Sequence, residues 1–123
     1  MSVPILKLGP FLVVAIQDEL TDSGWGDLRD TLLRRASRER SSGVVIDVSA
    51  MDVMDSFASR LLDNIARMLR LRGARTVVVG IQPGVAFAMA QLGLRLESSG
   101  TALDLDDGLA FLRRSARRTT RGG

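Results

Sequence analysis

The chain has 123 residues with a formal net charge of +3, and 46% of its residues are hydrophobic, so we expect one domain around one core. It contains no cysteine and no histidine, which excludes disulfides, thiol chemistry and the usual zinc sites. No basic stretch followed by an apolar run opens the chain and no apolar run approaches a membrane span; we therefore expect a cytoplasmic protein without a signal peptide or membrane segment.

Two β-rich apolar segments, residues 5–8 and 11–16, come first, and the Gly-Pro pair at 9–10 between them signals a turn. The pattern predicts an antiparallel hairpin. Residues 21–23, Thr-Asp-Ser, are then typical helix-capping residues, and apolar residues recur at spacings of three and four over 25–36. This pattern predicts an amphipathic helix.

A short strand is predicted over residues 44–46, ending at Asp47, because an apolar run without alternation is typical of a strand buried on both faces of a parallel sheet. A polar stretch follows as far as Ser56. Apolar residues then recur at i+4 from Phe57 to Leu69, which predicts a second helix that stops before Gly73. Either Asp55 or Ser56 can cap it.

Another buried strand is predicted over residues 76–79, and the loop 80–84 leads from it into a helix that starts near Pro83 and ends at Gly93. We expect residues 94–96 to form a last short strand. The buried face of the helix is expected to consist of Val85, Met89 and Leu92.

Asp104, with Asp107 three residues later, predicts the start of a final helix by an acidic variant of the capping box. Its buried side is expected to consist of Leu105, Leu109, Leu112 and Ala116.

The positive charge is concentrated at the carboxyl terminus. All 14 acidic residues precede the arginines of the last eleven residues, and without those five charges the net charge of +3 becomes −2. The chain has no tyrosine to stack on bases, so we expect a solvated helix end and a flexible basic tail over 119–123, not a nucleic-acid or membrane contact. These arginines are Arg113, Arg114, Arg117, Arg118 and Arg121.

The element order is thus β-β-α-β-α-β-α-β-α. Alternating strands and helices predict an α/β fold with a mostly parallel mixed sheet, an N-terminal antiparallel hairpin and about four helices. We find no internal repeat and no linker, so residues 1–118 are expected to form a single domain.

Catalytic chemistry has one candidate cluster, the carboxylates of Asp47, Asp52 and Asp55, which could hold magnesium in a metal-assisted enzyme. Carboxylates in front of a helix more often serve as caps, and we favour that interpretation. The loop Gly80-Ile-Gln-Pro-Gly84 matches neither the P-loop nor the dinucleotide fingerprint, so we expect no cofactor.

Ser56 lies at the start of the second predicted helix. A capping serine is one interpretation, worth about 1 kcal/mol. A phosphorylation site is the other, because the free backbone N–H groups and the positive end of the helix dipole accommodate a phosphate. Phosphorylation would then change the charge of a surface without unfolding the domain.

The segment 44–49, Val-Val-Ile-Asp-Val-Ser, followed by Met54-Asp-Ser-Phe57, resembles the core motif of STAS domains, the anti-sigma-factor antagonists. Three further segments narrow the resemblance to the stressosome branch of the family, the RsbS type: residues 4–7, residues 80–83, and 101–105 with Gly108-Leu109. The similarity covers about residues 4–112.

This resemblance implies a non-enzymatic protein that packs with copies of itself and with RsbR-type STAS sensor paralogues into a large complex. Its unmodified form holds an RsbT-type serine kinase, which leaves after phosphorylating the serine of the Asp-Ser motif, here Ser56. The implied docking surface consists of Asp52, Asp55, Phe57, Gly80, Ile81, Gln82 and Pro83.

Two departures from the family pattern bear on this interpretation. Plain anti-sigma antagonists carry a small, glycine-containing run after the serine, whereas residues 57–60 here are Phe-Ala-Ser-Arg, which favours the stressosome branch. Sensor paralogues carry a second acceptor threonine before the loop glycine, where this chain has Val79. We therefore predict a single main site, with Ser59 as a weaker candidate and Thr76 as a strand residue.

The alternative is a plain anti-sigma-factor antagonist regulated through the same serine. In that case the unphosphorylated form would displace a sigma factor from a switch kinase, and the protein would act as a monomer.

Overall fold

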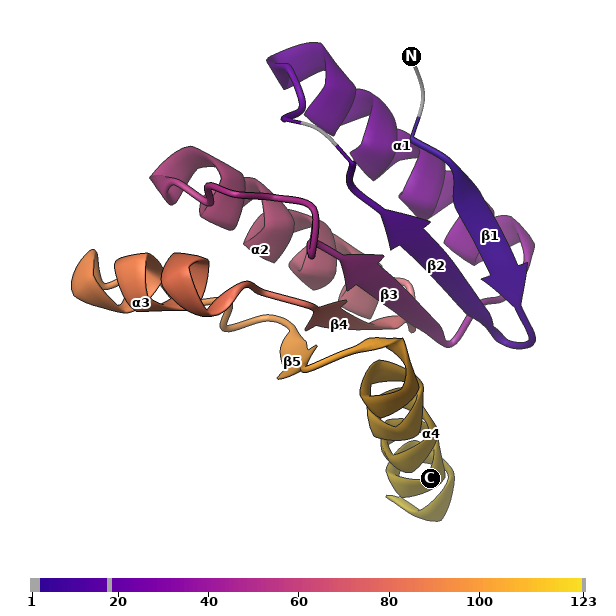
Figure 1. The fold of residues 1–123 in the computed structure, drawn as a ribbon. Helices are drawn as coiled ribbons and strands as arrows, with labels where there is room; N and C mark the ends of the chain where they lie inside the picture. The colour runs from indigo at the N-terminus through magenta and orange to yellow at the C-terminus, as the bar shows by residue number, and fades with distance from the viewer. Residues whose placement is uncertain (1–2, 18, 123) are drawn as a thin grey trace.

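The computed structural model describes residues 3–17 and 19–122, with side chains as far as Ala116. Five strands form one sheet in the order β1-β2-β3-β4-β5 (Figure 1). The strands are β1 (Ile5–Leu8), β2 (Phe11–Ala15), β3 (Gly43–Asp47), β4 (Arg75–Val79) and β5 (Gly100–Ala102). The helices are α1 (Asp22–Arg38), α2 (Ser56–Leu71), α3 (Pro83–Gln91) and α4 (Leu105–Gly122).

The pairing confirms the predicted hairpin and the mostly parallel sheet. β1 is antiparallel to β2, with Ile5 opposite Val14, and every other neighbouring pair is parallel. The flexibility expected of residues 119–123 stays a prediction, because Gly123 and the side chains from residue 117 onward lie outside the described residues.

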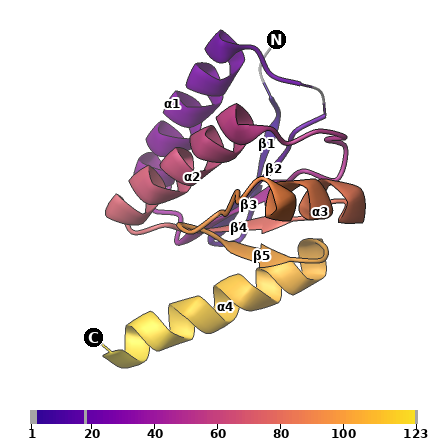
Figure 2. The ribbon, with the colours of Figure 1, turned by 90° about the vertical axis from the view of Figure 1, so that its left-hand side faces the viewer.

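Helices cover both faces of the sheet. α1 and α2 lie on one face and α4 on the other (Figure 2). Alternate strand residues divide accordingly: Val44 and Ile46 join the core beneath α1 and α2, whereas Val45 joins the core beneath α4. α4 approaches closely, because a Cβ on Gly108 would lie only 2.6 Å from a methyl carbon of Val79.

The prediction of a strand over residues 94–96 is wrong, because the last strand is β5, at Gly100–Ala102. Leu94 and Leu96 are half-buried against the core on the α1 and α2 side, in a segment without regular structure. β5 instead needs small residues, because a Cβ on Gly100 would lie 2.3 Å from the Phe111 ring of α4.

Two other leucines are less buried than expected. Leu92 is 68% exposed because α3 ends at Gln91, and Leu92 is its C-cap. Leu105 is 38% exposed and stands at the start of α4, one turn before the helix meets β4.

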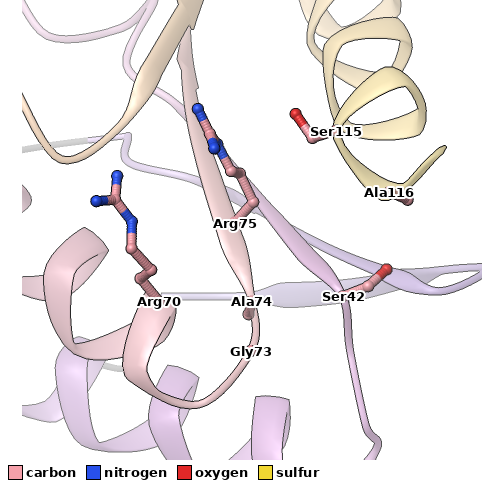
Figure 3. Close-up of a pocket in the computed structure, with 7 residues that line it drawn as sticks. All are labelled: Ser42, Arg70, Gly73, Ala74, Arg75, Ser115 and Ala116. Atoms are coloured by element: carbon pink, nitrogen blue, oxygen red, sulfur yellow. The ribbon is translucent and has the colours of Figure 1, made fainter. Parts of the chain in front are cut away.

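A cavity of about 390 Å³ opens at the amino ends of β3 and β4, between the end of α2 and α4 (Figure 3). Two of its side chains have structural partners: Arg70 donates a 3.1 Å hydrogen bond to the Ser98 carbonyl, and Arg75 stacks 5.3 Å from the centre of the Phe111 ring. Ligand sites of α/β sheets lie at the opposite, carboxyl ends of the strands. The lining residues are Ser42, Arg70, Gly73, Ala74, Arg75, Ser115 and Ala116.

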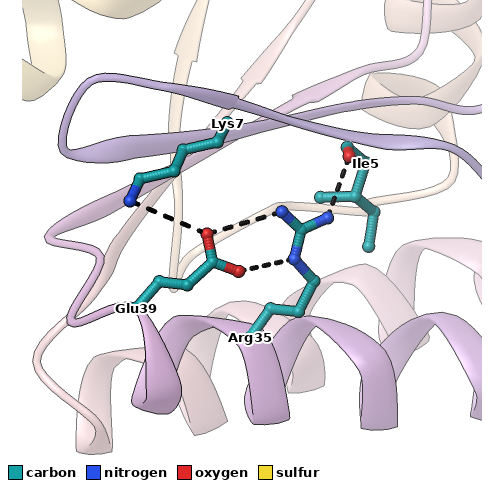
Figure 4. A network of polar contacts seen from close by, with 4 residues as sticks. All are labelled: Ile5, Lys7, Arg35 and Glu39. Carbon is teal, nitrogen blue, oxygen red and sulfur yellow. Dashed lines mark hydrogen bonds and ion pairs between the residues drawn. The ribbon is translucent and has the colours of Figure 1, made fainter.

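An ionic network fastens the edge strand β1 to α1 (Figure 4). Arg35 donates to the Glu39 carboxylate at 2.7 Å and to the Ile5 carbonyl at 2.9 Å, and Lys7 lies 4.0 Å from the same carboxylate. The hydrogen bond from Arg35 holds the pKa of Glu39 below its usual range. The network thus pairs a backbone carbonyl of the sheet edge with a side chain from the helix layer.

Candidate partner-docking site

Two loops meet at the carboxyl ends of β3 and β4, as parallel pairing requires. The Val48 N–H donates to the Val79 carbonyl at 3.0 Å, which extends the ladder into the loop after β3. The Asp47 carboxylate then accepts from the Ser49 N–H at 2.8 Å. Asp47 therefore shapes the first turn of this loop.

Gln82 links the two loops directly. Its side-chain amide donates to the Ser49 carbonyl at 2.8 Å and to the Asp52 carboxylate at 3.3 Å. Asp52 and the loop 80–83, expected to share one surface, are thus brought together. Ser49, which sequence reasoning did not single out, is the backbone contact between them.

Gly80 makes this close approach possible. Its φ of +79° lies in the left-handed region, and a Cβ there would be 2.9 Å from the Ser49 Cβ. A side chain would therefore meet both a backbone penalty and a steric clash.

Ser56 is the first residue of α2 and is exposed. Asp55, rather than Ser56, is the N-cap, since its carboxylate accepts from the Ala58 N–H at 2.8 Å. The capping role left open between these residues belongs to Asp55, so the Ser56 hydroxyl is not needed to begin the helix.

The loop between β3 and α2 is anchored by apolar side chains. Met51 and Met54 are buried in the core, whereas Val53 and Phe57 on either side of Asp55 are 56% and 46% exposed. The surface around Ser56 therefore combines exposed apolar groups with the carboxylates of Asp52 and Asp55, a composition suited to a protein partner.

Ser59 and Thr76 are buried, at 3% and 2% exposure, and their hydroxyls have no hydrogen-bond partner among the described residues. Thr76 lies in β4 as expected. Burial weighs against Ser59 as a second phosphorylation site, because a kinase must reach the hydroxyl that it modifies.

A hollow of about 330 Å³ lies beside Ser56, between α2 and the segment that follows α3. Its two arginines, Arg60 and Arg95, were not identified from the sequence. Arg60 could have been, because it stands four residues after Ser56 on the same helix face. Arg95 could not, since the segment containing it was expected to form a strand. The lining residues are Ser56, Ser59, Arg60, Asp63, Gly93, Leu94, Arg95 and Glu97.

Comparison with known proteins identifies the fold family. The family model described as "STAS domain" matches residues 3–107. The chain belongs to the STAS domain family. This membership confirms the resemblance seen in the motifs, and it makes the chain a non-enzymatic regulatory domain.

Solved structures place this STAS domain near stressosome proteins. A variant of Moorella thermoacetica RsbS with one serine replaced by glutamate is 40% identical, with a TM-score of 0.79 over 94% of this chain and 97% of that chain. A chain in a structure described as the molecular architecture of the stressosome, a signal integration and transduction hub, is also 40% identical, with a TM-score of 0.77 over 93% of this chain and 99% of that chain.

Among curated proteins, the RsbT co-antagonist protein RsbRA of Bacillus subtilis (strain 168) is 28% identical over 82 residues. The match covers 67% of this chain but only 30% of RsbRA, so this STAS domain spans less than a third of that relative.

The carboxylates considered for a metal-assisted enzyme do not converge. Asp47 accepts from Ser49, Asp52 from Gln82, and Asp55 caps α2. Among the described residues, no group of three or more acidic, histidine or cysteine side chains could hold a metal ion. The enzyme hypothesis therefore has no geometric basis in this part of the chain.

In the same residues, no helix is long and apolar enough to span a membrane.

Asp63 fastens the segment after α3 to the middle of α2. Its carboxylate accepts from the Ser98 N–H at 2.7 Å and from Arg67 at 3.0 Å. Burial opposes the negative charge, but the hydrogen bonds from Ser98 and Arg67 outweigh it, and the pKa of Asp63 lies below its usual range. This contact holds the wall of the hollow that contains Arg95.

We expect Asp63→Asn to lower the free energy of unfolding by about 1 to 2 kcal/mol at neutral pH, since charge-assisted hydrogen bonds are lost. A lowered pKa in the folded state stabilises the protein above the pKa of the unfolded chain, near 4, and this stabilisation disappears as the pH falls through the folded value. Denaturant unfolding across pH measures the difference between variant and wild type, which should close in acid. A difference that does not shrink as the pH falls below about 4 would contradict this role.

Asp27→Asn is the matched control for this measurement. Asp27 is exposed on α1, and its side chain makes no hydrogen bond or ion pair within the described residues. Its unfolding curve should overlay that of the wild type at each pH.

Proposed function

We propose that this chain is a stressosome scaffold protein and an antagonist of an RsbT-type serine kinase, which it releases when Ser56 is phosphorylated. One observation carries the proposal: an exposed serine begins α2 on the surface formed by two loops, in a chain 40% identical to a stressosome protein over nearly its full length. The setting would be the bacterial cytoplasm, in a large complex with copies of itself and RsbR-type STAS sensors.

The local charges support a switch at this position. A phosphate carries roughly −1.5 to −2 charge at neutral pH and would join the carboxylates of Asp52 and Asp55. A kinase surface fitted to a neutral hydroxyl would then face repulsion and desolvation of the new charge. Because Asp55 already caps α2, the helix keeps its start while the surface changes.

The test is Ser56→Ala, incubated with the RsbT-type kinase from the same genome and ATP. We expect wild type to incorporate one phosphate per chain and to release the kinase in size-exclusion chromatography. The alanine variant should bind the kinase, incorporate no phosphate and retain the kinase. Mass spectrometry locates the modification.

Ser49→Ala is the control, because Ser49 is an exposed serine of the same loop that the kinase should modify at no more than background. This variant should therefore incorporate phosphate as wild type does. Phosphorylation of the Ser56→Ala variant at the wild-type rate would contradict the assignment of Ser56 as the phosphorylation site. A persistent monomer that displaces a sigma factor from a switch kinase would instead support the plain antagonist.

A further inference from the structure

The hollow beside Ser56 is lined by two arginine side chains that have no acidic partner among the described residues. Arg60 on α2 and Arg95 after α3 are both exposed, and neither side chain makes a hydrogen bond or ion pair among the described residues. The Asp63 carboxylate, in contrast, already accepts a hydrogen bond from the Ser98 N–H and pairs with Arg67. Glu97 is the remaining charged side chain that lines the hollow. Two guanidinium groups are therefore free to bind an anion.

A second observation, independent of these charges, concerns Ser59. This residue lines the same hollow, is 3% exposed, and its hydroxyl has no hydrogen-bond partner in the described residues. A buried hydroxyl without a partner loses its hydrogen bonds to water without compensation. Ser59 therefore leaves an unsatisfied hydroxyl just behind the wall of the hollow.

Ser56, the residue to which a phosphate would be attached, also lines this hollow. It is the first residue of α2, at the positive end of the helix dipole. Arg60 follows by four residues, the spacing at which side chains on one helix face meet. The acidic residues Asp52 and Asp55 belong to the preceding loop and do not line the hollow.

We propose that a phosphate on Ser56 is bound within the same chain by Arg60 and Arg95. The inference rests on the proposed function only in taking Ser56 as the residue that is phosphorylated. Arginine suits this role because its planar fork of N–H donors matches phosphate oxygens. Binding would join the start of α2 to the segment after α3 and would withdraw two cations from the surface offered to a partner.

Phosphorylation would therefore change the docking surface in two ways. It adds negative charge next to Asp52 and Asp55, and it neutralises guanidinium groups that could otherwise contact acidic side chains of the kinase. A carboxylate at position 56 is shorter, carries less charge and would reproduce only part of this effect.

The test uses protein with phosphoserine genetically encoded at position 56, so it requires no kinase. The pKa of the phosphate, near 6 for a free phosphoserine, is measured by ³¹P NMR titration. We expect Arg60→Gln and Arg95→Gln each to raise this pKa by about 0.5 to 1 pH unit, because each removes a nearby positive charge. Arg95→Lys keeps a charge and should restore part of the lowering.

Arg34→Gln is the matched control, since Arg34 is an exposed arginine on α1 and does not line the hollow; it should leave the phosphate pKa unchanged. Amide NMR spectra establish that each variant is folded. A phosphate pKa that stays the same in both arginine variants would overturn the proposal. A phosphate pKa that is lowered only at high protein concentration would also overturn it, because the arginines would then belong to another copy of the chain. Failure of the kinase to modify Ser56 would count against the proposed function alone.

Discussion

Replacing Gly80 with alanine is expected to lower the free energy of unfolding by about 2 to 4 kcal/mol and to weaken kinase binding without touching Ser56. The backbone cost comes from a φ of +79°, which a residue with a Cβ adopts at a penalty of about 1 to 2 kcal/mol. The steric cost comes from the Ser49 Cβ, which the new methyl group would approach to 2.9 Å.

The second effect follows from the position of the clash. Ser49 is the residue whose carbonyl accepts from Gln82, and Gln82 also reaches Asp52. Relief of the clash requires the loops after β3 and β4 to separate, which strains both hydrogen bonds. If the docking surface spans the two loops, its geometry is lost even though the hydroxyl of Ser56 stays in place.

Gly84→Ala is the matched control, from the same connection. Gly84 has no positive φ, a Cβ on it would have no neighbour within 4 Å, and it stands in the first turn of α3. Alanine there should be neutral or slightly stabilising, because glycine is the poorer helix former. Denaturant unfolding and kinase-binding titrations measure both variants. Equal stability of the two alanine variants would contradict the role assigned to Gly80.

The sequence predicted most of the fold because its signals are local. An unbroken apolar run identified β3, i+4 periodicity identified α2, and Asp104 with Asp107 marked the start of α4, where Asp104 now accepts from the Asp107 N–H at 2.9 Å. These patterns need no knowledge of what lies across the sheet.

The last strand could not be predicted in this way. Leu94 and Leu96 have the better apolar pattern, but β5 needs residues small enough to fit beneath Phe111, a contact made by a helix that follows it in the chain. For the same reason Arg95 was missed as a neighbour of Ser56, since only the path of residues 94–99 over α2 brings them to one hollow.

Phosphorylated Ser56 is expected to lower the affinity for the kinase by about 100-fold or more, which corresponds to about 2.7 kcal/mol. Burying a charge that has no partner at an interface costs several kcal/mol, and the phosphate brings roughly −1.5 to −2 charge to a surface that would fit a neutral hydroxyl. Ser56→Asp adds a single charge on a shorter side chain and should therefore weaken binding less. Calorimetric titration of the encoded phosphoprotein and of the aspartate variant with the kinase measures both affinities.

Ser37→Asp separates the location of the charge from its presence. Ser37 lies near the end of α1, at the opposite end of the helix layer from Ser56, and its hydroxyl accepts from Arg72 at 2.8 Å, so a carboxylate there has a partner. This variant should bind the kinase as wild type does. If Ser37→Asp weakened binding as much as phosphorylated Ser56, net charge alone would account for the loss, whereas a loss confined to position 56 requires that the kinase contact the start of α2.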